Sequence, residues 1–386
     1  MEKEGWVKKK LGEVLTVERG GSPRPINAFL TDSEDGLNWI KIGDTVEGSR
    51  YISHTKEKIK PEGLKKSRFV HKGDFILSNS MSFGKPYILN IEGCIHDGWL
   101  VLHDDYNTFD KNYLYYFLSS PCVYKEFQRM AVGGVVNNLN SALVRSLPII
   151  YPPLPEQQQI VSELDCLQGI IDKKKEQLQE LDKLAQSIFY TMFGDPVENE
   201  KGWDTKKLKD VSPKKDYKED IPSIDGKYWL LNLDMVESNT GKVISKVLFD
   251  YEEIGNSTNK FNTENILYSK LRPYLNKVVI PEDIGYSTSE LVPLYPQKDI
   301  LNRYFLAFLL RSKSFVHYIS DKVAGAKMPR VNMDSFYKFY VILPPLPLQQ
   351  EFADKISAIE QQKARITQSL QDTETLFQSR MDYYFG

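Results

Sequence analysis

The chain has 386 residues, of which 41% are hydrophobic and 26% are charged, and its formal net charge is −2. This length allows two or three domains, and because no window approaches about 18 consecutive apolar residues, we expect no membrane segment. The three cysteines are far apart and odd in number, which excludes a disulfide framework and a Cys-x-x-Cys metal site and favours the reducing cytoplasm.

The chain contains an internal repeat. Pro152-Pro-Leu-Pro-Glu-Gln-Gln recurs as Pro344-Pro-Leu-Pro-Leu-Gln-Gln, and residues 152–194 align without a gap to residues 344–386, with 13 of 43 positions identical. The segment that begins at Trp6 also matches the segment that begins at Trp203. Because the matches occur at both ends in the same order, they indicate two copies of one unit of about 190 residues.

Each copy begins with a region that predicts a mixed α/β domain. Short β-rich runs at 38–42, 74–78 and 277–280 are separated by Gly, Pro and Asn. A run rich in Tyr, Phe and Leu at 112–118 has its counterpart at 302–310. We interpret both runs as short buried helices, and an aromatic platform for stacking bases is the alternative.

Each copy ends in a region that predicts one long helix. Apolar residues recur there in a heptad frame, and Pro155 and Pro347 stand where the helices would begin. About 38 residues of helix would be about 57 Å long. Such a helix needs a partner for its apolar stripe, and the other copy is the simplest partner.

Signatures of catalysis are absent from the sequence. It holds no nucleotide-binding GxxxxGK[ST] loop, no HExxH and no glycine-rich dinucleotide fingerprint, and its five histidines lack the spacing of metal ligands. The residues that match between the copies are helix formers, prolines and apolar residues. We therefore expect neither a catalytic site nor a metal site in this chain.

The Pro-Pro-Leu-Pro-Glu-Gln-Gln start, the long heptad helix after it and the tandem layout together resemble the specificity subunits of type I restriction–modification enzymes. The resemblance covers essentially the whole chain. It implies target-recognition domains at 1–151 and 195–343 and spacer helices at 152–194 and 344–386. The implied fold class is α+β, with the two helices packed as an antiparallel coiled coil and the repeat related by a pseudo-twofold axis.

The resemblance also implies a non-catalytic subunit that recognises double-stranded DNA. It would assemble with two methyltransferase subunits and with translocase–nuclease subunits. Those partners would bind S-adenosylmethionine, ATP and Mg²⁺, and this chain would bind no cofactor. Because the two domains differ in sequence, the DNA site should be bipartite and asymmetric.

Candidate DNA contacts come from loops that match between the copies. Residues 269–277 match 78–85, and lysine or arginine there could contact guanine edges or phosphates, with a solvated turn as the alternative. Residues 325–332 match 133–140, where glycine allows close approach to phosphate. The candidates in these four loops are Ser80, Lys85, Asn137, Asn138, Ser269, Lys270, Arg272, Tyr274, Lys277, Lys327 and Arg330. Arg24, Lys214 and Lys215 lie in polar stretches for which a structural role is the preferred interpretation.

Apolar residues of the first long helix also lie off its heptad stripe. They are Val161, Ile170, Leu184, Phe189 and Phe193. An exposed apolar patch is typical of a protein interface, so we select Ile170, Leu184 and Phe189 as contacts for a methyltransferase subunit. In the alternative, the recognition domains fold back and cover these residues.

Two other classes of function stay open from the sequence alone. The chain could be a stand-alone enzyme such as a duplicated nuclease, or a coiled-coil adaptor that binds only proteins. Cleavage or methylation by the purified chain would support the enzyme, and failure to bind DNA beside a methyltransferase would support the adaptor.

Overall fold

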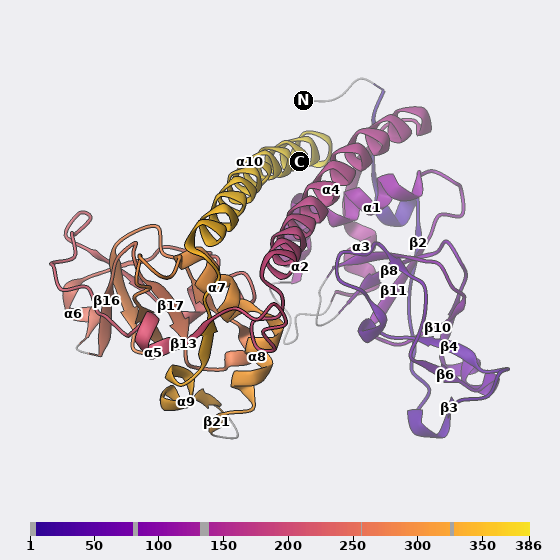
Figure 1. Cartoon of the computed structure of the whole chain (residues 1–386). Coiled ribbons are helices and arrows are strands. Elements are labelled where there is room, and N and C mark those ends of the chain that lie inside the picture. Colours follow the sequence, from indigo (N-terminus) through magenta and orange to yellow (C-terminus); the bar gives the residue numbers. More distant parts are fainter. Residues whose placement is uncertain (1–4, 80–83, 132–138, 256, 325–327) are drawn as a thin grey trace. The chain divides into compact units, whose positions relative to one another are not determined.

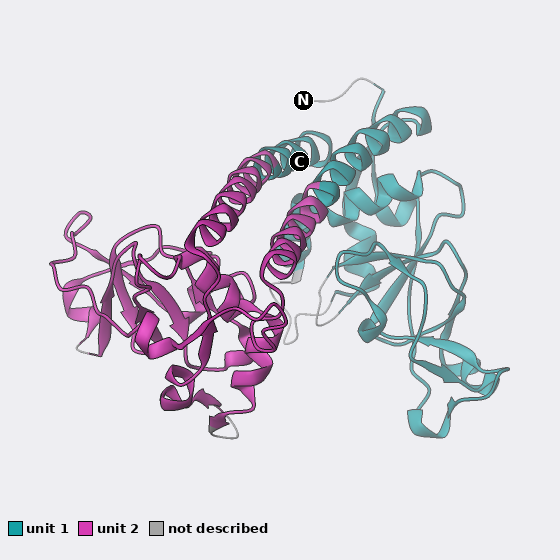
Figure 2. Ribbon diagram, in the orientation of Figure 1, with its two compact units in different colours: residues 1–173, 370–386 teal, residues 174–369 magenta. Residues whose placement is uncertain are grey.

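The computed structural model describes residues 5–79, 84–131, 139–255, 257–324 and 328–386. The chain divides into unit 1, residues 1–173 and 370–386, and unit 2, residues 174–369 (Figures 1 and 2). Each unit holds one α/β head and parts of both long helices. We name residues 5–151 head 1 and residues 195–343 head 2.

Head 1 is built around two five-stranded sheets, in the orders β3-β6-β4-β10-β7 and β2-β11-β8-β9-β5, and β1 pairs with β12. Its strands are β1 (Val7–Lys10), β2 (Thr16–Arg19), β3 (Leu30–Thr31), β4 (Leu37–Ile40), β5 (Tyr51–Ile52), β6 (Glu57–Ile59), β7 (Arg68–Val70), β8 (Phe75–Ser78), β9 (Pro86–Leu89), β10 (Gly93–Ile95), β11 (Trp99–His103) and β12 (Pro148–Tyr151). Its helices are α1 (Lys111–Ser119), α2 (Pro121–Ala131) and α3 (Ser141–Ser146).

Head 2 has a four-stranded sheet in the order β15-β14-β19-β16, a three-stranded sheet in the order β18-β17-β20, and the pairs β13-β23 and β21-β22. Its strands are β13 (Thr205–Lys207), β14 (Tyr228–Leu231), β15 (Leu248–Phe249), β16 (Thr258–Phe261), β17 (Ile266–Ser269), β18 (Val278–Val279), β19 (Gly285–Thr288), β20 (Leu291–Leu294), β21 (Val323–Ala324), β22 (Arg330–Val331) and β23 (Tyr340–Ile342). Its helices are α5 (Leu208–Val211), α6 (Tyr251–Ile254), α7 (Arg303–Arg311), α8 (Lys313–Ser320) and α9 (Met333–Tyr337).

The two heads repeat one topology, which confirms the internal repeat. The parallel pair β4–β10 corresponds to β14–β19, and the antiparallel pair β8–β11 corresponds to β17–β20. The pair β1–β12 corresponds to β13–β23, which joins the first strand of each head to its last. The β-rich runs near 38–42, 74–78 and 277–280 lie in β4, β8 and β18, as predicted.

The aromatic runs form α1 and α7, and both helices are core elements. Tyr113 and Phe117 of α1 are buried in the core of unit 1, and Phe305 and Leu309 of α7 are buried in the core of unit 2. The interpretation as buried helices is therefore confirmed, because side chains packed inside a head cannot stack on bases.

The repeated proline–glutamine motif attaches each long helix to its own head. The Gln157 side chain accepts a hydrogen bond from Asp110 N at 2.8 Å and donates to Thr108 O and Pro152 O at 3.1 and 2.9 Å. Gln349 makes the same three bonds in unit 2, with Asn302 N, Ile300 O and Pro344 O. Both glutamines are fully buried, so the motif is structural.

The two long helices are α4 (Leu154–Phe193) and α10 (Leu346–Phe385), of 40 residues each (Figure 1). In unit 1, Glu163 of α4 accepts hydrogen bonds from Arg380 and Tyr384 of α10 at 2.9 and 2.6 Å. In unit 2, Lys363 donates to Asp182 at 2.7 Å. As the position along α4 rises from 163 to 182, the partner on α10 falls from 380 to 363, so the helices pack antiparallel, as predicted.

None of the helices in the described ranges has the length and apolar character needed to cross a membrane.

Candidate nucleic-acid interface

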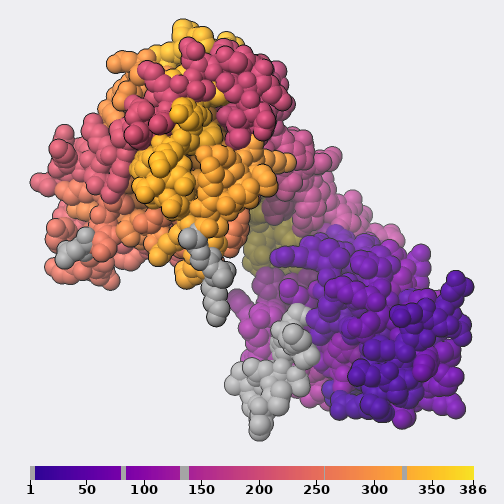
Figure 3. All heavy atoms as spheres, turned by 60° about the horizontal axis from the view of Figure 1, so that its bottom comes forward, coloured from indigo at the N-terminus to yellow at the C-terminus, as the bar shows by residue number. Residues whose placement is uncertain are grey.

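Two loops of head 2 that are far apart in the sequence lie side by side. Val331 N donates to Lys270 O at 2.8 Å, and Arg272 N donates to Pro329 O at 2.8 Å. We name residues 269–277 and 328–331 together the head-2 loop joint. Met328 and Arg330 of the joint are exposed at the surface of unit 2, whose C-terminal part is orange to yellow in Figure 3. The two loops proposed separately as DNA contacts are thus hydrogen-bonded to each other.

Head 1 builds the same joint with equivalent hydrogen bonds. Leu139 N donates to Asn79 O at 3.0 Å, as Val331 N does to Lys270 O. Ser78 N donates to Lys85 O at 3.0 Å, as Ser269 N does to Lys277 O. The candidates Ser80, Asn137, Asn138 and Lys327 lie outside the described residues.

Basic and aromatic side chains are exposed at the head-2 loop joint. Arg272 is exposed and has a left-handed backbone (φ 50°), which is uncommon for a residue other than glycine. Tyr274 is 55% exposed and Lys270 is half-buried. The Arg330 side chain is 59% exposed and forms an ion pair with Glu290, with 2.9 Å between Nη2 and Oε1.

Two candidates in the same loop serve the fold instead. Ser269 is 3% exposed and its hydroxyl donates to Leu271 O at 2.9 Å, so its selection as a DNA contact is corrected. Lys277 is half-buried and its Nζ donates to Leu233 O at 2.6 Å. The Ser269 hydroxyl binds within the turn, whereas the Lys277 ammonium connects the turn to Leu233. Lys85, the head-1 counterpart of Lys277, is exposed.

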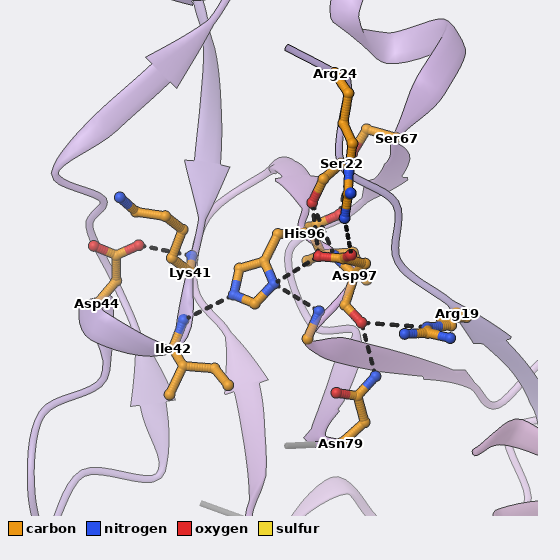
Figure 4. A network of polar contacts seen from close by, with 12 residues as sticks. Arg19, Ser22, Arg24, Lys41, Ile42, Asp44, Ser67, Asn79, His96 and Asp97 are labelled. Atoms are coloured by element: carbon orange, nitrogen blue, oxygen red, sulfur yellow. Dashed lines mark hydrogen bonds and ion pairs between the residues drawn. The ribbon is translucent and has the colours of Figure 1, made fainter. Parts of the chain in front are cut away.

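A polar network around Asp97 holds the loop of Arg24 in head 1 (Figure 4). The Asp97 carboxylate accepts from the Ser22 hydroxyl at 2.8 Å and forms an ion pair with Arg24 at 3.4 Å. Its backbone carbonyl accepts from Asn79 Nδ2 at 2.8 Å. The Ser22 hydroxyl holds the pKa of Asp97 below its ordinary value. Asp97 therefore connects the Arg24 loop to Asn79: its carboxylate, which stays ionised at neutral pH, holds the loop, and its backbone carbonyl binds Asn79.

His96, beside this network, is not arranged for nucleophilic catalysis. Its ring nitrogens face the backbone N–H groups of Ile42 and Gly98 at 3.2 and 2.6 Å, and burial lowers its pKa. The Ser22 hydroxyl donates to Asp97, not to the imidazole. Because the hydroxyl is bonded to the carboxylate and not to the imidazole, this Ser, His and Asp do not form a triad.

The Arg24 loop borders an open hollow of about 880 Å³ in head 1. Charged, aromatic and apolar side chains line it, and they include Ser22, Arg24, Trp39, Lys41, Glu57 and His96. The Arg24 side chain is 81% exposed. In contrast, the preceding glycines are structural, because a Cβ on Gly20 would lie 2.2 Å from His96 O.

The matching stretch of head 2 presents Lys214 and Lys215, and both side chains are exposed. Lys214 Nζ lies 3.5 Å from the Asp216 carboxylate, and Lys215 Nζ lies 3.7 Å from the centre of the Tyr295 ring. Both lysines therefore lie at the surface of head 2.

A basic segment of head 1 was missed by the sequence analysis. Residues 56–68 hold six Lys or Arg against two Glu, and the exposed members are Lys56, Lys60, Lys65 and Lys66. The helical turn Pro61–Lys66 lies against the Arg24 loop, since a Cβ on Gly21 would come within 2.8 Å of Lys66 O. A charge count over short windows of the sequence finds this segment, whereas the net charge of the whole chain hides it.

The apolar residues off the stripe of α4 fall into two groups. Val161, Phe189 and Phe193 are 8% exposed or less, and the Phe189 ring packs 5.7 Å from Phe305 of head 2. The expectation that Phe189 is a surface contact is therefore wrong, because α7 covers it. Ile170 and Leu184, in contrast, are 38% and 47% exposed.

A groove between α4 and the end of α10 lies in unit 1, close to Ile170 in the sequence. Its volume is about 460 Å³, and it is lined by Gln159, Ser162, Glu163, Cys166, Leu167 and Leu376. Leu376 is 49% exposed. Among the residues that the structure describes, no group of three or more His, Cys, Asp or Glu is placed to hold a metal ion.

One family model matches two segments of the chain. The model described as the type I restriction modification DNA specificity domain matches residues 3–183 and again residues 200–373. These two matches correspond to the two copies of the repeat.

Several specificity subunits are similar to this chain. The MjaIX specificity subunit of Methanocaldococcus jannaschii is 23% identical over 382 residues, covering 90% of this chain and 85% of that one. The EcoDI specificity subunit of Escherichia coli is 20% identical over 260 residues, covering 59% and 58%.

Two solved structures share the fold. A structure described as the basis of complex assembly and conformational transition of the type I R-M system has a TM-score of 0.62 at 16% identity, covering 99% of this chain and 98% of that one. The S subunit of the type I system from M. genitalium has a TM-score of 0.56 at 12% identity, covering 100% and 97%.

Proposed function

Because the chain belongs to the family of type I restriction–modification DNA specificity subunits, we propose that it recognises a bipartite, asymmetric DNA sequence, one half through each head. In this family role the chain recognises DNA and performs no catalysis. The observation that carries the proposal is the loop joint, which both heads build with equivalent hydrogen bonds but with different side chains.

The proposed DNA contacts are basic and aromatic residues of the two heads, all of them exposed except the half-buried Lys270 and two partly buried members of the basic segment, Lys58 and Arg68. In head 2 they are Lys214, Lys215, Lys270, Arg272, Tyr274 and Arg330, and in head 1 they are Arg24, Lys85 and the basic segment 56–68. Four further DNA contacts are proposed from their place in the sequence alone: Ser80, Asn137, Asn138 and Lys327. The low net charge of −2 is compatible with this role because local clusters, not the total, contact phosphates.

The partners we propose are two methyltransferase subunits, and translocase–nuclease subunits for restriction. They would supply S-adenosylmethionine, ATP and Mg²⁺, since the chemistry of the complex belongs to them. Ile170 and Leu184 are the proposed methyltransferase contacts, because large apolar side chains exposed on a helix favour a protein partner. We propose a cytoplasmic location, and the free thiols of Cys94, Cys122 and Cys166 support a reducing compartment.

Exchanging head 2 tests the proposal. Residues 195–343 are replaced by the matching head of a relative, and adenine methylation is mapped across the genome of cells that contain the partner subunits. One half of the methylated motif should change while the other half stays the same, because each head has its own core. A motif that changes in both halves, or a wild-type complex that methylates no two-part motif, would contradict the proposal.

A further inference from the structure

We infer that Arg330 contacts a guanine and that Glu290 positions it, so that this pair determines one base of the half-site recognised by head 2. The inference rests on the proposed function and names one recognition element within it. Arginine donates two parallel hydrogen bonds to guanine O6 and N7, which is the commonest specific contact in the major groove.

The backbone of Arg330 is held from two sides. It lies in β22, where it pairs with Ala324 of β21, and it also forms a bridge with Leu271 of the neighbouring loop. Val331 N donates to Lys270 O, and Lys270 N donates to Glu290 O at 3.0 Å. The Cα atoms of Arg330 and Glu290 are therefore fixed relative to each other. Such rigidity is what distinguishes a precise contact from a flexible charged loop.

Glu290 is more buried than Arg330, so the ion pair orients one edge of the guanidinium toward the protein and leaves the rest toward solvent. Glu290 is 20% exposed and its Oε1 accepts from Arg330 Nη2 at 2.9 Å, while Arg330 is 59% exposed. Glu290 Oε2 is buried and has no hydrogen-bond partner among the described residues, so this carboxylate depends on Arg330 for compensation. One of the five N–H donors of Arg330 is thus directed inward to Glu290, and other donors remain for DNA.

The equivalent place in head 1 has no such pair. Asn79 N donates to Gly98 O at 3.0 Å, as Lys270 N does to Glu290 O, so Gly98 stands where head 2 has Glu290. A glycine cannot anchor an arginine. The two heads therefore differ at this place, which gives one physical source for the asymmetry of the proposed site.

The test measures binding of the full chain with its methyltransferase partner to DNA duplexes. The duplexes carry the motif of the wild-type complex and every single-base change in the half-site assigned to head 2. For Arg330→Ala we expect discrimination at one guanine to fall about 5- to 140-fold, and discrimination at all other positions to stay unchanged. Arg330→Lys should lose the same discrimination, because an ammonium lacks the planar fork.

Glu290→Gln should lower discrimination at the same guanine by a smaller factor, since it keeps the shape but removes the charge. Arg129→Ala is the matched control, because Arg129 is an exposed arginine paired with Glu126 on a head-1 helix outside the loop joint. It should leave every position unchanged.

Three results would overturn the inference while the proposed function stands. The first is a head-2 half-site without guanine on either strand. The second is an Arg330→Ala complex that keeps full discrimination. The third is a uniform loss over all sequences, restored by Arg330→Lys, with a salt slope lowered by about 1, which would identify a phosphate contact. If Arg330→Ala does not fold, the inference is tested with Arg330→Lys and Glu290→Gln, and either variant overturns it by keeping full discrimination at the guanine. A wild-type complex without a two-part motif would instead refute the proposed function.

Discussion

Replacement of Gln349 by alanine should weaken the attachment of α10 to head 2. Gln349 is fully buried and bonds to Asn302 N, Ile300 O and Pro344 O at 2.9, 3.1 and 2.7 Å. Alanine removes all three bonds at once and leaves one buried donor and two buried acceptors. Because these backbone groups belong to the start of α7 and the start of α10, the damage should concentrate where the helix meets the head.

The magnitude follows from the number of groups that lose their partner. A buried polar group without a partner costs about 1–3 kcal/mol, so three groups cost about 3 kcal/mol at the lower limit. For a unit of this size, each kcal/mol lowers the melting temperature by about 2–4 °C. The melting transition of unit 2 should therefore fall by at least about 6 °C.

Circular dichroism melting of the full chain provides the assay, and Gln350→Ala provides the matched control. Gln350 is the next residue, but it is exposed, and its bonds to Asn302 Nδ2 and Asp354 lie at the surface. We expect Gln350→Ala to change stability by less than about 0.5 kcal/mol. If Gln349→Ala melted within about 2 °C of the wild type, the motif would not be the structural clamp described above.

Two further predictions concern the helix surface and the pH dependence of head 1. Ile170→Glu and Leu184→Glu should each reduce co-purification with the methyltransferase while the chain keeps its helicity. The control Gln179→Glu, at an exposed polar position of α4, should leave co-purification unchanged. If Ile170→Glu and Leu184→Glu co-purified as the wild type does, the proposed contact would be refuted. The hydrogen bond to Asp74 raises the pKa of His103 above its ordinary value of 6.5, so the stabilisation is complete below pH 6.5 and is lost as pH rises through the raised value. The melting temperature of His103→Gln should thus lie further below the wild type at pH 6 than at pH 8.5, and equal differences would show that the contact is not stabilising.

The long helices were predictable because their signals are local. A heptad frame and a proline at the first turn are properties of neighbouring residues, and the observed helix α4 begins one residue before the predicted Pro155. The strand partners were not predictable in this way. Val7 pairs with Tyr151 across the whole of head 1, and no short-range pattern in the sequence specifies a pairing over that separation.

The candidate site was predicted as separate loops, and its assembly could not be predicted. Lys270 and Val331 are joined by a hydrogen bond across about 60 residues of sequence. The burial of individual side chains could not be predicted either. Phe189 and Leu184 both lie off the heptad stripe of α4, but α7 covers Phe189 while Leu184 stays 47% exposed. Which residues off the stripe stay exposed depends on where a head packs, and that is a tertiary property.

The loop joint separates the parts of a head that must stay constant from those that can vary. Its hydrogen bonds run between backbone atoms, from Leu139 to Asn79 in head 1 and from Val331 to Lys270 in head 2. Since such bonds do not depend on side-chain identity, the joint can keep its geometry while its exposed side chains change. Glu290 in head 2 and Gly98 in head 1 illustrate this at one equivalent place. Under the proposed function, we expect that a new base preference requires a few substitutions at the joint and no new fold.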